Sequence, residues 1–154
     1  MLTLRPFTAQ DASVVATWFP DQAAALAFAG RCARWPVDPA ELLVRNEQPD
    51  VEPLTATDPN DHGAVLGHVE LVRVTDATGR LARIVLAPGL RGHGLSTVML
   101  VAAIERARRA GIRELALLVV PGNTAALRAY AKVGFSETAP HPDHPEYVRL
   151  ARSI

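Results

Sequence analysis

The stretch "LAPGLRGHGLSTVML", residues 86–100, decides the fold that the sequence predicts. It ends the β-branched run "RIVLA", passes through one proline and three glycines, and enters apolar residues at the three-and-four spacing of a helix face. We therefore expect a strand, a glycine-rich turn and a helix in direct succession. A turn that only connects a strand to a helix needs one glycine at most, so the others indicate that a ligand approaches the main chain closely.

This turn has the properties of an anion site. The first N–H groups of the following helix have no partner within the helix, and the positive end of the helix dipole lies behind them. Gly92 and Gly94 leave room for a phosphate to touch the backbone. Arg91 adds positive charge, and Ser96 or Thr97 offers a hydroxyl donor. The alternative is a flexible turn that only begins a helix.

Two common phosphate motifs are excluded by the residues of the turn. No lysine followed by Ser or Thr is present, as a nucleotide P-loop requires, and "GHGLST" lacks the third glycine of the dinucleotide fingerprint. A diphosphate carried by another cofactor remains. His93 within the turn is expected to face solvent rather than to act as an acid or base.

The second half of the chain alternates strands and helices. Two apolar runs, 64–74 and 80–88, are joined by "TDATGR" and predict an antiparallel hairpin. The elements then expected are a helix over 95–110 ended by Gly111, a strand over 113–120, a helix over 123–133 closed by Gly134, and strands within 134–139 and 146–154. This order predicts an α/β or α+β domain with a mixed sheet and helices packed on its faces.

The first half of the chain carries weaker signals. Residues 2–7 predict a short strand, and 8–19 predict a helix that Pro20 interrupts. Further helices are expected over 21–30, ending at Gly30, and from Asp38, with Pro39 in the first turn. The segment 48–63 is rich in turn residues and is strand-like only in "PLTAT", residues 53–57.

Composition limits the class of protein. The 154 residues are 49% hydrophobic, which is enough for one globular domain, and the formal net charge is zero, so no nucleic acid or membrane partner is expected. The single cysteine, Cys32, excludes an internal disulfide and favours a reducing compartment; we expect it to be a buried apolar side chain. No signal segment or membrane span is found, so we expect a cytoplasmic protein.

Two motifs resemble the GNAT superfamily of acyl-CoA-dependent N-acetyltransferases. The stretch 86–100 is similar to its coenzyme A pyrophosphate loop, with Arg91, Gly94 and Ser96 at the positions of Arg/Gln, Gly and Gly/Ala. Ser96 departs from the last position, but it is still small. The segment "GNTAALRAYAKVGF" resembles the part in which Asn123 begins a helix, Tyr130 follows seven residues later, and a Gly-Phe pair opens the next strand.

With the opening "LRPFTAQD", these matches extend over nearly the whole chain. The stretch "FAGRCARWPVDPAEL", residues 28–42, resembles a bacterial subset of the superfamily. The resemblance implies one GNAT domain over residues 1–154. Its expected fold is a mixed, largely antiparallel sheet of six to seven strands, splayed in the middle and flanked by about four helices.

The resemblance also implies roles for individual residues. Acetyl-CoA would be the co-substrate, and a primary amine would attack its thioester directly. Backbone groups of residues 84–86 would pair with the pantetheine arm and polarise the carbonyl, Asn123 would hold a pantetheine amide, and Tyr130 would protonate the thiolate. The complete set implied for cofactor binding is Ile84, Val85, Leu86, Arg91, Gly92, His93, Gly94, Leu95, Ser96, Thr97 and Asn123.

The general base is left open. The acids that family members place in the fifth or fourth strand are absent, because Leu118 stands at the first place and Arg80 and Arg83 at the second. Glu70, which shares a strand face with His68, is the candidate catalytic base. Glu70 could instead be an ion-pair partner, and the proton could pass to His68 or to water. The ion-pair candidates are Arg73, Arg80 and Arg83.

The acceptor is predicted only as a primary amine, on a small molecule or on a protein. Trp35 and the helices of the first fifty residues are expected to border its groove. His141 and His144 lie in a proline-rich loop that favours exposure over metal binding, so no metal is assigned. A homodimer through the last strands is possible for such a fold. The alternative function is a non-catalytic acyl-CoA-binding sensor or partner module.

Overall fold

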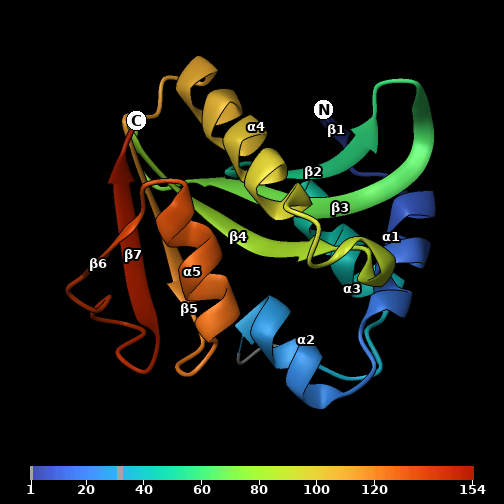
Figure 1. The fold of residues 1–154 in the computed structure, drawn as a ribbon, viewed down its shortest axis with the longest axis horizontal. Coiled ribbons are helices and arrows are strands. Elements are labelled where there is room, and N and C mark those ends of the chain that lie inside the picture. Colours follow the sequence, from blue (N-terminus) through green and yellow to red (C-terminus); the bar gives the residue numbers. More distant parts are fainter. Residues whose placement is uncertain (1, 31–32) are drawn as a thin grey trace.

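The computed structural model describes residues 2–30 and 33–154, so the prediction for Cys32 falls outside the described residues. A seven-stranded sheet has the order β1-β2-β3-β4-β5-β7-β6, and five α-helices accompany it (Figure 1). The strands are β1 Thr3–Pro6, β2 Val51–Asp58, β3 Asp61–Arg73, β4 Thr78–Leu86, β5 Glu114–Val119, β6 Ser136–Thr138 and β7 Val148–Ser153. The helices are α1 Ala9–Val15, α2 Gln22–Ala29, α3 Pro39–Val44, α4 Leu95–Arg109 and α5 Thr124–Lys132.

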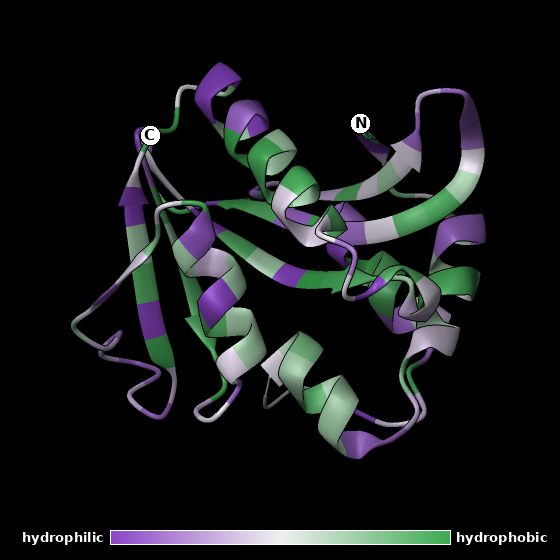
Figure 2. Ribbon diagram, in the orientation of Figure 1, coloured by the Kyte–Doolittle hydropathy of each residue, from purple (hydrophilic) through white to green (hydrophobic). Residues whose placement is uncertain are grey.

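The expected mixed, largely antiparallel sheet is confirmed, since β4 and β5 form its one parallel pair among the described strands. Within the described ranges the α-helices number five, where about four were expected. Apolar residues follow the strands of the sheet (Figure 2), as a sheet with helices on both faces requires. No helix among the described residues is long and apolar enough to cross a bilayer.

The two faces of the sheet bury different kinds of residue. On one face, Val69 and Leu71 of β3 pack in the main core with Leu100 and Ile104 of α4. On the other face, Glu70 of β3 contacts Arg45, which follows α3, and His68 contacts the ring of Phe7. The strand therefore separates an apolar interior from a region that holds buried polar groups.

The sheet parts between β4 and β5. These strands pair only at Thr78–Glu114, Gly79–Leu115 and Arg80–Ala116, and beyond these positions they diverge (Figure 1). A bulge accompanies the divergence, because His68 pairs with Val85 while Glu70 pairs with Ala82. Arg83 lies in this bulge with a φ of 49°, which is rare for a residue with a side chain. The expected splayed sheet is thus confirmed.

Local signals explain the helix ends of the first half. Thr8 and Asp11 form a capping box at the start of α1, and Asp21 and Asp38 cap α2 and α3. The expected stop at Gly30 is observed, where φ is +68°.

Two sequence predictions need correction. The helix expected over 8–19 ends at Val15 and continues as a 3-10 turn, Ala16–Trp18. The segment 48–63 contains far more strand than residues 53–57, because β2 and β3 form a long hairpin there. Main-chain pairing keeps its exposed polar residues extended without any apolar alternation.

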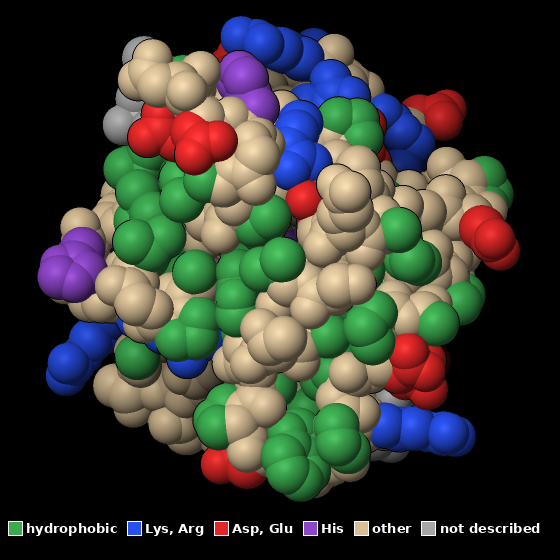
Figure 3. Space-filling view, turned by 90° about the vertical axis from the view of Figure 1, so that its right-hand side faces the viewer, with side chains coloured by type: hydrophobic (Ala, Val, Ile, Leu, Met, Phe, Trp, Pro, Cys, Tyr) green, Lys and Arg blue, Asp and Glu red, His purple; other side chains and the backbone are tan. Residues whose placement is uncertain are grey.

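The surface shown in Figure 3 carries apolar side chains across its middle, and basic side chains gather along its upper edge. Acidic side chains are interspersed around the rim, so both signs of charge occur on this face. This pattern agrees with a formal net charge of zero. It differs from the single-sign surface that nucleic-acid binding proteins present.

Candidate functional site

The glycine-rich turn leaves its main chain uncovered. It consists of the 3-10 turn η4 Pro88–Leu90, followed by Arg91 and the two glycines Gly92 and Gly94, at φ +81° and +76°. A Cβ at either glycine would meet no heavy atom within 4 Å. Gly94 is the N-cap of α4 and supplies no side-chain hydrogen bond. The first N–H groups of α4 therefore face open space with the helix dipole behind them.

The side chains of the turn and of the start of α4 differ in exposure. His93 is exposed, as expected, while Leu95, Ser96 and Thr97 are half-buried at the start of α4. The guanidinium of Arg91 donates to the carbonyl oxygen of Leu86 at 3.3 Å, which ties the turn to the end of β4.

The gap between the parted strands is bordered by β4 on one side and α5 on the other. Ile84, Val85 and Leu86 belong to the part of β4 that does not pair with β5, and Val85 and Leu86 pair with β3. Asn123 is the N-cap of α5, and its side-chain oxygen accepts from the N–H of Ala126 at 3.2 Å. The NH2 group of Asn123 remains able to donate to a ligand.

Tyr130 lies about two helical turns after Asn123. Its ring packs edge-on against Phe135, with ring centroids 6.4 Å apart. Burial raises the pKa of Tyr130 to about 12, so the phenol remains protonated at neutral pH. Its hydroxyl makes no hydrogen bond within the described part of the chain, which leaves the proton available.

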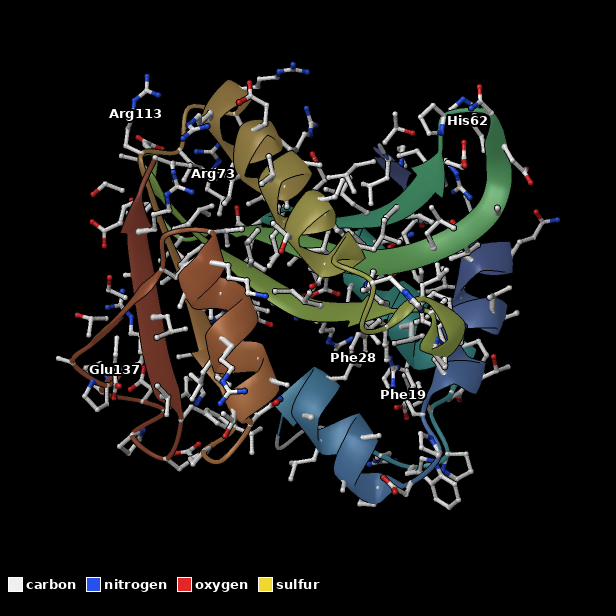
Figure 4. The ribbon with its side chains drawn as sticks, viewed as in Figure 1. Phe19, Phe28, His62, Arg73, Arg113 and Glu137 are labelled. Carbon is white, nitrogen blue, oxygen red and sulfur yellow. The ribbon has the colours of Figure 1, made fainter. Side chains whose placement is uncertain are left out.

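A cavity of about 480 Å³ opens where β4 and β5 part, on the face that carries α1–α3. Phe28 of α2 lies beside β4 there (Figure 4). Five segments far apart in the sequence form the walls: the end of α2, the turn after α3, β4, the end of β5 and the loop before β7. The main side chains are Leu26, Phe28, Arg45, Arg80, Arg83, Leu118, Val120, His144 and Tyr147.

Glu70 is in an ion pair, one of the two roles that the sequence left open. Its carboxylate is 1% exposed and accepts from Arg45 at 2.9 Å and 3.1 Å. Arg83 lies at 4.0 Å from the other oxygen. Of the three expected partners only Arg83 is within ion-pair distance of Glu70. Arg73 donates to main-chain oxygens of Asp76 and Ala110 instead.

Arg45 is the functional residue that sequence reasoning missed. It belongs to the 3-10 turn η3, Arg45–Glu47, which follows α3. It reaches Glu70 across 25 positions of the chain, and no motif or periodicity connects the two. The packing of η3 against β2 brings them together.

Arg80 differs from Arg45 in having no acceptor. Its side chain lines the cavity half-buried, and its guanidinium forms no hydrogen bond or ion pair with any residue in 2–30 or 33–154. Burial lowers the pKa of Arg80, and the positive charge of Arg45 lowers it further, against a smaller opposite effect of Glu70. The positive charge of Arg80 therefore lies close to another positive charge, that of Arg45.

His68 is buried as a neutral side chain. It is 1% exposed and lies between Phe7, at 4.3 Å between ring centroids, and Phe28, at 6.1 Å. Burial is the largest cause that lowers the pKa of His68, to about 3, and the positive charge of Arg83 is the second cause. A group with this pKa is a poor acceptor for the proton of an amine.

The remaining expectations concern the loop and the groove. The rings of His141 and His144 lie 5.3 Å apart, but no group of three or more metal-binding side chains occurs among the residues described. Trp35 does not line the cavity; its indole N–H donates to the carbonyl oxygen of Phe19 at 2.8 Å. The helix from the first fifty residues that does border the cavity is α2.

Comparison with known proteins gives the same family as the fold and the turn. The acetyltransferase (GNAT) family matches residues 16–135. The uncharacterized N-acetyltransferase YobR of Bacillus subtilis (strain 168) is 37% identical over 70 residues, which make up 46% of this chain and 28% of YobR. The match thus spans less than a third of that relative.

Solved structures share the fold at low identity. The GNAT domain of S. lividans PAT has a TM-score of 0.77 at 19% identity, with 98% of this chain and 89% of that chain covered. The spermidine N-acetyltransferase from Vibrio cholerae, solved in complex with CoA and spermine, has a TM-score of 0.77 at 17% identity, with 99% and 95% covered. The family match includes both the glycine-rich turn and the segment 123–135, and this protein therefore belongs to the GNAT family of acetyltransferases.

Proposed function

We propose that this protein transfers an acetyl group from acetyl-CoA to a primary amine by direct attack. The observation that carries the proposal is the parted sheet, which has an uncovered glycine turn at one end of β4 and a cavity where β4 leaves β5. A cofactor in the gap and an acceptor in the cavity would meet at the unpaired part of β4. The family match and the CoA-bound relative support this arrangement.

The cofactor half of the proposed site consists of main-chain donors. The pyrophosphate would bind the turn of Arg91, Gly92, His93 and Gly94 and the first residues of α4, Leu95, Ser96 and Thr97. The pantetheine arm would pair with the free edge of residues 84–86, and the NH2 of Asn123 would donate to one of its amide oxygens.

The reaction forms a C–N bond and breaks the C–S bond of the thioester. A main-chain N–H on the free edge of β4 polarises the carbonyl as charge develops on its oxygen. The departing thiolate takes the proton of Tyr130, whose pKa of about 12 keeps the phenol protonated until then.

We assign the proton of the attacking amine to water in the cavity. Glu70, the expected base, is almost fully buried and already accepts from Arg45, so it cannot take the proton without leaving that ion pair. His68 is too weak a base, with a pKa of about 3. Glu70 then serves to hold Arg45 and Arg83 in place.

Two glycines at opposite ends of α4 test the cofactor site. Gly94 and Gly111 both have positive φ, +76° and +85°, and both leave open space for a Cβ. Gly94→Ala and Gly111→Ala therefore carry a similar backbone strain. We expect only Gly94→Ala to weaken acetyl-CoA binding, by about tenfold or more, in a thermal-shift titration. Equal affinities of the two variants would contradict the proposed site.

Thiol release separates the enzyme from the alternative, an acyl-CoA-binding sensor. Acetyl-CoA with a panel of amines should release free thiol, and Tyr130→Phe should lower kcat by about a hundredfold while acetyl-CoA affinity stays unchanged. A thermal shift without release on any amine would favour the sensor. The absence of a thermal shift would remove both functions.

A further inference from the structure

The cavity has more positive than negative charge. Three arginines line it, Arg45, Arg80 and Arg83, and no acidic side chain does so among its described lining residues. Glu70 forms an ion pair with Arg45 and lies near Arg83, whereas the guanidinium of Arg80 is outside this ion pair and adds a positive charge to the cavity. A further acid, Glu146, lies 4.0 Å from His144 and is not a lining residue.

Arg80 is placed to use this charge. It is the last residue of β4 that pairs with β5, so it lies at the point where the strands separate. Ala82, on the same strand face, is about 7 Å further along the unpaired part. An acceptor bound to Arg80 would therefore reach the free edge of β4 within the length of a small molecule.

Two other walls of the cavity are apolar. Leu26 and Phe28 come from α2, and Leu118 and Val120 come from β5. These side chains would bury an aliphatic or aromatic group of the acceptor. They offer no partner for a second ammonium group, such as that of a polyamine.

We propose that the acceptor is a primary amine that also carries a carboxylate, as an amino acid does, and that Arg80 binds this carboxylate. The inference rests on the proposed acetyl transfer. Arg45 and Arg83 stabilise the same negative charge from the position that Glu70 gives them, and the apolar walls contact the rest of the molecule. Polyamines are poor acceptors, because they bring more positive charge into a cationic cavity.

The test compares amines that differ only in the carboxylate. Thiol release from acetyl-CoA is measured at one pH with L-leucine, L-leucinamide and isopentylamine. The same series is measured for phenylalanine, its amide and its decarboxylated amine. The amide is the stricter control, since its amine is deprotonated more readily than that of the amino acid. We expect kcat/KM to be at least tenfold higher with the carboxylate than with either counterpart.

Variants of Arg80 assign the effect to this residue. Arg80→Gln should remove the preference for the carboxylate through a rise in KM, and Arg80→Lys should restore part of it. Arg113→Gln is the matched control, because Arg113 is exposed at the end of the sheet far from α2 (Figure 4). Both Arg113→Gln and wild type should keep the preference. An unchanged preference in Arg80→Gln, or equal turnover of the decarboxylated amines, would overturn the proposal.

Two further arms identify failures of other kinds. Succinyl-CoA is offered with the decarboxylated amines; turnover only in this combination would place the carboxylate on the acyl chain and overturn the acceptor assignment. Isocaproate, which has the carboxylate without the amine, should raise the melting temperature of the CoA-bound wild type but not of Arg80→Gln. If isocaproate does so while no amine releases thiol, the proposed reaction fails and the carboxylate site stands. If neither occurs, both are overturned.

Discussion

Two buried carboxylates on the same side of the sheet have very different surroundings. Asp11, which is 3% exposed, accepts from Arg5 at 2.6 Å and 2.9 Å, from the N–H of Thr8 at 2.9 Å and from the hydroxyl of Thr55 at 2.8 Å. Glu70, which is 1% exposed, accepts hydrogen bonds from Arg45 alone among the residues described. Every donor to Asp11 belongs to the framework of β1, α1 and β2, whereas Glu70 borders a cavity.

The difference separates an ion pair of the framework from one that borders the proposed acceptor site. Around Asp11 one arginine matches one carboxylate, and the neutral donors complete its hydrogen bonding, so nothing is left for a ligand. Around Glu70 arginines outnumber acids, and Arg80 has no acceptor among the described residues. Such an excess is costly in a closed interior and is tolerated beside a cavity that water or an anion can enter.

The largest effect is expected where a carboxylate has fewest donors. Arg45→Met should lower the free energy of unfolding by about 3 kcal/mol, because it leaves Glu70 buried with Arg83 at 4.0 Å as its nearest cation. Arg5→Met should cost only about half of that, since Thr8 and Thr55 still donate to Asp11. Urea denaturation of both variants measures the difference. A larger loss in Arg5→Met would reverse the comparison.

The next effect is the loss of folding stability at acidic pH. Burial alone would raise the pKa of Asp11, but hydrogen bonds from Arg5, Thr8 and Thr55 lower it from 3.8 to about 2. Because the folded-state pKa is the lower one, the carboxylate stabilises the fold above pH 4 by about 2 kcal/mol, and this contribution is lost as the pH falls toward 2. Asp11→Asn should remove it at neutral pH and flatten the stability profile in that window, as followed by denaturation at each pH. A profile parallel to that of wild type would contradict the assignment.

A smaller effect is expected from a single neutral donor. Thr55→Val keeps the shape of the side chain and removes its hydrogen bond to Asp11, while Arg5 and Thr8 remain. The free energy of unfolding should fall by about 1 kcal/mol, and acetyl-CoA affinity should not change. A change in affinity would mean that the Asp11 group communicates with the cofactor half.

The smallest effect on stability is expected at Arg80. Arg80→Gln removes a cation that has no acceptor among the described residues, so the free energy of unfolding should stay within about 0.5 kcal/mol of wild type. Chemical denaturation of the variant checks this expectation. If the free energy of unfolding fell as much as in Arg45→Met, Arg80 would be a structural residue. The distinction between the two carboxylate regions would then be wrong.

The sequence predicted what depends on neighbouring residues. The start of α4 after Gly94, the caps Asp21 and Asp38, and the end of α2 at Gly30 all follow from chemistry within one turn. The divergence of β4 from β5 was expected only through the family resemblance, because strand pairing depends on register between distant segments.

The cavity could not be predicted in the same way. Arg45 was absent from the candidate partners of Glu70. Tertiary packing, and no sequence motif, places α2 in the wall of the cavity. The long hairpin of β2 and β3 was missed because exposed polar residues in paired strands show no alternation. Local pattern thus predicts the residues of the proposed cofactor half, whereas the cavity of the proposed acceptor half is found only in the structure.

Three residue pairs between β4 and β5 are the main-chain connection between the two parts of the sheet. A pantetheine chain in the gap would add hydrogen bonds along the edge where strand pairing is missing, so the co-substrate would complete the sheet as an extra strand does. Acetyl-CoA would then reinforce β5, β7 and β6 against local opening, and the folding stability of the protein would depend on its supply of substrate.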